Sequence, residues 1–130
     1  MPCSELRRIL FVEDDPDIRT VATMALEAVG GFSVLACDSG TQAIEKAPAF
    51  NPDLVLLDVM MPGLDGPATL EALRRLPEIR ETPVVFMTAR VQAHEVNRYK
   101  EMGAADVIAK PFDPMALADT VRSIWSGLAS

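Results

Sequence analysis

The stretch Leu54-Val55-Leu56-Leu57-Asp58 decides the fold, because it is a short, wholly apolar run that ends in an acid. Three other runs have the same form and lead into polar residues: residues 8–12 into Glu13-Asp14-Asp15, residues 84–87 into Thr88, and residues 107–109 into Lys110-Pro111. Short apolar runs followed by helical patterns are typical of buried parallel strands. Ligands bind beyond the carboxyl ends of such strands, so these polar residues lie where chemistry is expected.

Strand and helix patterns alternate five times along the chain, which predicts an α/β fold. Asp15-Pro16 and Asp113-Pro114 are helix start signals, because an acid suits the N-cap and proline suits the first turn. We predict a second strand at residues 32–36. The predicted helices cover residues 16–29, 39–47 with Pro48 as the interruption, 67–76, 91–102, and the stretch from Pro114 to Leu128.

The composition indicates a single soluble domain covering residues 1–130. Hydrophobic residues make up 49% and aromatic residues 5%, so the core is expected to be aliphatic. The net charge of −7 and the pI of about 4.6 argue against nucleic acid as a direct partner. No apolar run is long enough to cross a membrane, and the first residues lack the apolar region of a secretory signal. Cys3 and Cys37 are too few for a zinc motif, so we expect free thiols and a cytoplasmic location.

The four strand ends resemble those of the receiver domain of bacterial two-component response regulators, over essentially the whole chain. That family has an acidic pair, a phosphoacceptor Asp, a Ser or Thr, and a Lys-Pro at these places. The corresponding residues here are Glu13-Asp14, Asp58, Thr88 and Lys110-Pro111, and the loop Val59-Met60-Met61-Pro62-Gly63-Leu64-Asp65-Gly66 also resembles the family's loop. The resemblance implies a three-layer, doubly wound (βα)5 flavodoxin-like fold with a parallel five-stranded sheet of order 2-1-3-4-5.

The resemblance further implies a switch in a two-component phosphorelay, not an enzyme in the ordinary sense. Asp58 would accept a phosphoryl group from a sensor histidine kinase or a histidine phosphotransfer protein, with Mg²⁺ as cofactor. Oxygen ligands suit Mg²⁺, so Asp14, Asp58 and the backbone carbonyl of Met60 are the expected ligands. Glu13 is expected to act through water, and Asp15 is left to cap the helix.

Thr88 and Lys110 are the residues expected to bind phosphoryl oxygens. The chain has three lysines, Lys46, Lys100 and Lys110, and only the last stands at a strand end. The family resemblance also implies a cis peptide bond between Lys110 and Pro111.

The expected readout of phosphorylation is a movement of Thr88 that displaces the loop before the 91–102 helix. The face formed by that helix, the fifth strand and the final helix is therefore the candidate output surface and a possible homodimer interface. Receivers usually have Tyr or Phe three residues before the strand-five lysine, but this chain has Val107. Valine is short and stiff at χ1, so Tyr99 is considered as a partial substitute.

Met60 and Arg90 stand two residues beyond Asp58 and Thr88. In the family, these two positions tune the lifetime of the aspartyl phosphate. We predict that a bulky Met60 and a cationic Arg90 slow hydrolysis by shielding the site from water.

Three other functions compete with the switch. A phosphorylation-independent interaction module on the same fold is kept open by Val107. A phosphatase of the haloacid dehalogenase type would need a second acid where Met60 stands. A nucleotide-binding flavodoxin-like protein would need a glycine-rich loop after the first strand. The kinase, the downstream partner and the completeness of the chain stay open.

Overall fold

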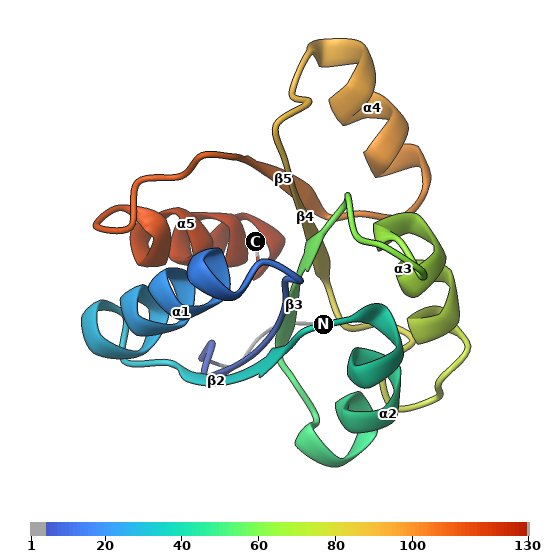
Figure 1. The fold of residues 1–130 in the computed structure, drawn as a ribbon, viewed down its shortest axis with the longest axis horizontal. Coiled ribbons are helices and arrows are strands. Elements are labelled where there is room, and N and C mark those ends of the chain that lie inside the picture. Colours follow the sequence, from blue (N-terminus) through green and yellow to red (C-terminus); the bar gives the residue numbers. More distant parts are fainter. Residues whose placement is uncertain (1–4, 130) are drawn as a thin grey trace.

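A computed structural model describes residues 5–129 and contains one parallel sheet (Figure 1). Its strands are β1 (Arg8–Val12), β2 (Ser33–Cys37), β3 (Leu54–Asp58), β4 (Val84–Thr88) and β5 (Asp106–Ala109). They lie in the order β2-β1-β3-β4-β5, and every neighbouring pair is parallel. This confirms the predicted sheet and its order. The expected free thiol of Cys3 lies outside the described residues.

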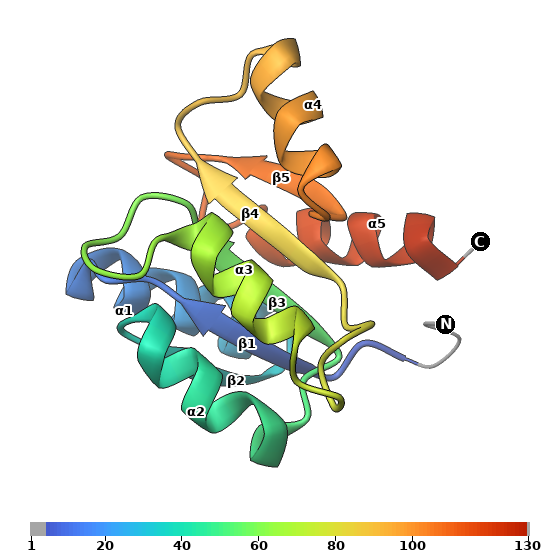
Figure 2. The same cartoon turned by 90° about the vertical axis from the view of Figure 1, so that its right-hand side faces the viewer.

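Helices cover both faces of the sheet and complete the three predicted layers (Figures 1 and 2). One face carries α1 (Pro16–Met24), its continuation as the π-helix η1 (Ala25–Val29), and α5 (Leu117–Ala129). The other face carries α2 (Gly40–Phe50), α3 (Gly66–Arg74) and α4 (Ala93–Glu101). No described helix is long and apolar enough to cross a membrane.

Side chains from successive strand residues enter two different cores, because they point to opposite faces of a sheet. Leu10 and Leu57 belong to the core under α2, α3 and α4, whereas Phe11 and Leu56 belong to the core under α1 and α5. All five residues of β3 are buried, so this strand is the centre of both cores. Asp58 is thus placed at the end of a strand that is buried along its whole length, as β4 also is.

Of the two predicted helix start signals, Asp15-Pro16 begins a helix and Asp113-Pro114 does not. The Asp15 carboxylate accepts hydrogen bonds from the amides of Asp17 and Ile18, so the predicted cap of α1 is confirmed. Asp113 accepts a hydrogen bond from the Met115 amide, but it caps only a turn. Regular helix begins at Leu117 and not at Pro114, so the prediction for α5 was early.

Two further predicted boundaries, the end of α2 and the start of β2, were wrong. Pro48 does not interrupt α2, which continues to Phe50 and ends at Asn51 in the left-handed conformation. A proline this close to the end removes one hydrogen bond, and buried Ala43 and Ala47 keep the helix against the core. Phe32 lies before β2, because its amide donates to the Leu26 carbonyl instead of pairing in the sheet.

The carboxyl ends of all five strands lie on one side of the sheet, called here the carboxyl edge, and the loops that follow the strands lie together there (Figure 2). β1 begins and α5 ends at the opposite edge. The peptide bond between Lys110 and Pro111 is cis, as expected. The residues at the carboxyl edge therefore come from β1, β3, β4 and β5 together.

Candidate functional site

Lys110 lies between two buried carboxylates at the carboxyl edge of the sheet. Its Nζ atom is 2.9 Å from Oε1 of Glu13 and 3.2 Å from Oδ1 of Asp58. The three residues end or follow β5, β1 and β3, strands that are far apart in the sequence. Glu13 is 1% exposed and Asp58 is 3% exposed, so the ion pairs are largely removed from water.

A second feature of the site is a cluster of three acids. One carboxylate oxygen each from Glu13, Asp14 and Asp58 lies within 4.8 Å of the others. Hard oxygen donors of this kind fit a Mg²⁺ ion, which prefers carboxylates and retains several waters. Asp14 is the most accessible of the three, so water can reach the cluster from its side. The donor set therefore fits the predicted cofactor.

Burial changes the acid–base properties of this group. It raises the pKa of the Glu13 carboxyl to about 7, although Lys110 opposes the shift. It also raises the pKa of Asp58, again against the effect of Lys110. Burial alone would lower the pKa of Lys110, but its ion pairs with the two acids outweigh this and raise it. Lys110 consequently stays charged, while both acids bind protons more tightly than free carboxyls.

Thr88 is the last residue of β4, which lies beside β3. It directly follows Met87, the residue that pairs with Asp58 in the sheet. It is 1% exposed, and its hydroxyl oxygen accepts a hydrogen bond from the Arg90 amide at 3.0 Å. The Arg90 side chain extends to Glu95, with Nη1 3.8 Å from Oε2. Arg90 is thus connected to α4 in this state.

Met60 contacts the site through its backbone. Its amide lies 3.4 Å from Oδ1 of Asp58, and the residue as a whole is 65% exposed. Val107 is partly buried against the core under α4 and is paired with Phe86 in the strand register. No aromatic side chain occupies the Val107 position.

Two positioning residues were missed by the sequence analysis. The Arg19 guanidinium donates to the carbonyls of Glu13 at 2.8 Å and Asp14 at 3.3 Å, which fixes the loop that carries both acids. Gly66 begins α3 where a Cβ atom would lie 2.7 Å from the Val59 Cα and 2.8 Å from the Asp58 carbonyl oxygen. Their only sequence signals are a basic residue one turn into α1 and a glycine before Pro67.

An apolar groove of about 250 Å³ runs beside the site, between α1 and the loop after β5. Lys110 forms one end of its lining, and the other lining residues are Asp17, Ile18, Val21, Pro111, Phe112 and Pro114. Val21 is 45% exposed, so part of this apolar surface faces solvent. The groove therefore adjoins the acidic cluster through Lys110.

Comparison with known protein families explains this arrangement. The family model described as the response regulator receiver domain matches residues 9–122. The chain belongs to the receiver-domain family of response regulators. Receivers are signalling phosphoacceptors phosphorylated by histidine kinases, and they are not true enzymes. The acidic cluster of this receiver is consistent with a phosphoacceptor site and typical of the Mg²⁺ site of the family.

The receiver is similar to curated regulators that are about twice its length. It is 40% identical over 121 residues to the transcriptional regulatory protein CseB of Streptomyces avermitilis, covering 93% of this chain and 50% of CseB. It is 38% identical over 117 residues to the DNA-binding response regulator MtrA of Mycobacterium tuberculosis, covering 90% of this chain and 50% of MtrA. The receiver therefore spans about half the length of these relatives.

Its fold is similar to that of a solved chemotaxis protein, CheY4 of Vibrio cholerae. The TM-score is 0.84 at 27% sequence identity, and the match covers 92% of this chain and 99% of CheY4. The receiver fold predicted from the strand ends is therefore shown by family, by sequence relatives and by structure.

Proposed function

We propose that this receiver is a phosphoacceptor switch in which Asp58 takes a phosphoryl group from the phosphohistidine of a sensor histidine kinase or a histidine phosphotransfer protein. The observation that carries the proposal is the contact of Lys110 with both Asp58 and Glu13, beside Asp14. A carboxylate oxygen of Asp58 attacks the phosphorus, and the phosphorus–nitrogen bond breaks with its electron pair going to the imidazole.

The groups around Asp58 support this transfer by opposing negative charge. The Lys110 ammonium, 3.2 Å from Oδ1 of Asp58, would turn to a phosphoryl oxygen, and the Thr88 hydroxyl would donate to another. Charge-assisted hydrogen bonds of this kind contribute about 1.5–3 kcal/mol each. Asp14, Asp58 and the Met60 carbonyl would bind Mg²⁺ directly and Glu13 through water. Bound Mg²⁺ would supply charge neutralisation between the nucleophile and the phosphoryl group.

The apolar groove next to Lys110 would receive the protein that carries the phosphohistidine. It is continuous with the site through Lys110, and its lining is mostly apolar. The output surface would be the face formed by α4, β5 and α5, which would bind a downstream protein or a second copy of this chain. With its net charge of −7, we do not expect this domain itself to contact nucleic acid.

The decisive test is incubation with Mg²⁺ and acetyl phosphate, followed by intact mass measurement. We expect one phosphate-sized adduct on the wild type and none on Asp58→Asn. Asp119→Asn, at an exposed position on α5, is the matched control and should retain the adduct. No adduct on the wild type would contradict the proposal and favour a phosphorylation-independent interaction module, the alternative that the valine at position 107 keeps open.

A further inference from the structure

The helix α4 is attached to the sheet mainly through one aromatic side chain. Tyr99 is its one buried residue, and the other positions are exposed or partly exposed. The Tyr99 ring meets the Phe86 ring edge-on, with centroids 5.4 Å apart and an interplanar angle of 90°. An edge-to-face pair of this kind contributes about 0.5–1.5 kcal/mol beyond its buried area. The position of α4 therefore depends strongly on where the Tyr99 ring lies.

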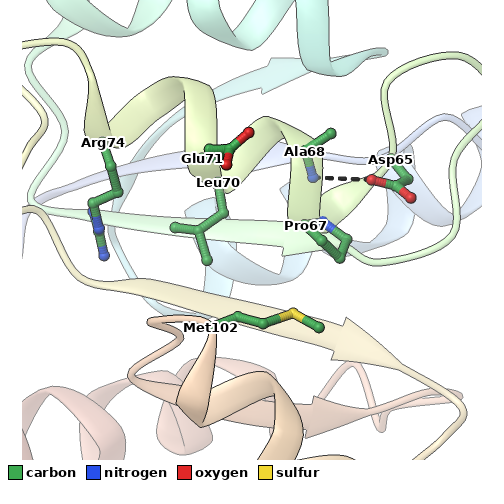
Figure 3. Close-up of a pocket in the computed structure, with 7 residues that line it drawn as sticks. All are labelled: Asp65, Pro67, Ala68, Leu70, Glu71, Arg74 and Met102. Carbon is green, nitrogen blue, oxygen red and sulfur yellow. Dashed lines mark hydrogen bonds between the residues drawn. The ribbon is translucent and has the colours of Figure 1, made fainter.

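Open space borders the Tyr99 ring on the side facing α3. A groove of about 260 Å³ is lined by Val59, Pro67, Arg90, Glu95, Arg98, Tyr99 and Met102. A second groove of about 710 Å³ follows, where Met102 lies across from Pro67 and Leu70 of α3 (Figure 3). Pro67 and Met102 line both grooves, so the two grooves are neighbours between α3 and α4. Tyr99 thus borders open space on the side of α4 that faces α3.

Short contacts connect the phosphoryl site with the first turn of α4. The Thr88 hydroxyl accepts from the Arg90 amide, and the Arg90 guanidinium lies 3.8 Å from the Glu95 carboxylate. Glu95 in turn accepts from the Gln92 amide at 3.2 Å and closes the capping box of α4. A Thr88 hydroxyl that turns to a phosphoryl oxygen changes its contact with Arg90, at the start of α4.

We propose that Tyr99 is the positioning residue that conveys the state of Asp58 to α4, in place of an aromatic side chain at Val107. This inference rests on the proposed phosphoacceptor function. Val107 pairs with Phe86 in the strand register, but its short side chain, stiff at χ1, cannot distinguish two states by a large rotation. The Tyr99 ring contacts Phe86, two residues before Thr88 on the same face of β4, and borders the open groove. On phosphorylation the ring leaves its edge-on contact and α4 shifts with it.

The chain contains one tyrosine and one tryptophan, which allows a direct test. Protein labelled with fluorotyrosine gives a single ¹⁹F resonance, from Tyr99. Protein labelled with fluorotryptophan gives one from Trp125, which belongs to the core on the other face of the sheet and serves as the internal control. Each sample is recorded with Mg²⁺ alone and then with acetyl phosphate, and the adduct is quantified by intact mass in the same tube.

We expect a new Tyr99 resonance whose fractional intensity equals the fraction of phosphorylated protein, with the Trp125 resonance unmoved. In Asp58→Asn the new resonance should be absent. An adduct without any change at Tyr99 would overturn this inference and leave the phosphoacceptor function standing. Equal changes at Tyr99 and Trp125 would also overturn it, because they would report a global rearrangement. Absence of the adduct would overturn the phosphoacceptor function and this inference with it.

Discussion

At the scale of single residues, the site combines two buried acids with one lysine. Lys110 contacts Glu13 and Asp58 at the same time, so one positive charge compensates two carboxyls. Burial raises the pKa of both acids, and for Glu13 the charge of nearby Asp58 adds to the rise. The site is thus arranged to attract a further cation.

This imbalance predicts a pH dependence of Mg²⁺ binding. The pKa of Glu13 is raised to about 7, so below that pH the acids retain a proton that a metal ion must displace. The affinity for Mg²⁺ should therefore rise with pH and level off above pH 7. If one proton is displaced, the rise between pH 6 and pH 8 should be about tenfold. Calorimetric titration at both pH values measures it, and Glu13→Gln should flatten the dependence. Equal affinities at the two pH values would contradict the expectation.

The exposed Met60 side chain leads to a second prediction at this scale. Met60→Asn should speed hydrolysis of the aspartyl phosphate roughly two- to tenfold, a barrier change of about 0.4–1.4 kcal/mol, because an amide can orient water where a thioether shields the site. Decay of the phosphorylated protein, followed by intact mass, gives the rate. Met24→Asn is the control, since Met24 is similarly exposed at 62% but lies on α1. Unchanged decay in Met60→Asn would rule out the shielding role.

At the scale of elements, the packing of α3 against the loop after β3 depends on Gly66. Its amide donates to the Val59 carbonyl at 2.9 Å, and a Cβ atom would meet the backbone of Val59 and Asp58. Backbone cannot give way as a flexible side chain can. The glycine therefore sets how closely α3 approaches the acceptor.

We expect Gly66→Ala to lower the free energy of unfolding by about 1–3 kcal/mol, as overpacking does. It should also reduce the extent of phosphorylation, because Asp58 would be displaced. Gly127→Ala on α5 is the matched control: nothing lies within 4 Å of its added Cβ, and it should be neutral or stabilising. Urea unfolding of both variants decides the matter. Equal stability of Gly66→Ala and wild type would show that the backbone can move.

Element boundaries also show what could be predicted from the sequence. The sheet and the α1 cap were predictable because apolar runs and capping are local signals, as at Asp15. The continuation of α2 past Pro48 could not be predicted from the sequence, because it depends on packing of the helix against the core. The contact between Lys110 and Glu13 joins residues far apart in the chain and appears only after the sheet forms. Arg19 was missed because its acceptors are backbone carbonyls, which carry no residue signature.

At the scale of the whole molecule, the site lowers the stability of the fold that supports it. A carboxyl whose pKa is higher in the folded state than in the unfolded state favours folding when protonated. For Glu13 the stability should therefore fall as pH rises from about 4.5 to about 7. Asp58 contributes in the same direction.

Removing one of these charges should stabilise the metal-free protein. We expect Asp58→Asn to raise the free energy of unfolding by about 1 kcal/mol near pH 8, because Lys110 then pairs with Glu13 alone. Urea unfolding with a chelator present measures the change. Asp119→Asn, on the exposed side of α5, should stay within about 0.5 kcal/mol of wild type. A less stable Asp58→Asn would mean that the Asp58–Lys110 pair stabilises the fold.

Asp58 ends β3, and the start of β1 and the end of α5 lie on the opposite side of the sheet from the ends of the strands (Figure 2). A tether fused ahead of β1 or after α5 would therefore hold the molecule by the side opposite the acidic cluster, so that this cluster faces away from the attachment point. On a biosensor surface, every immobilised copy would present Asp58 and the groove beside Lys110 to a passing phosphodonor. The same geometry would let many copies be displayed side by side on a scaffold without blocking one another's acceptors.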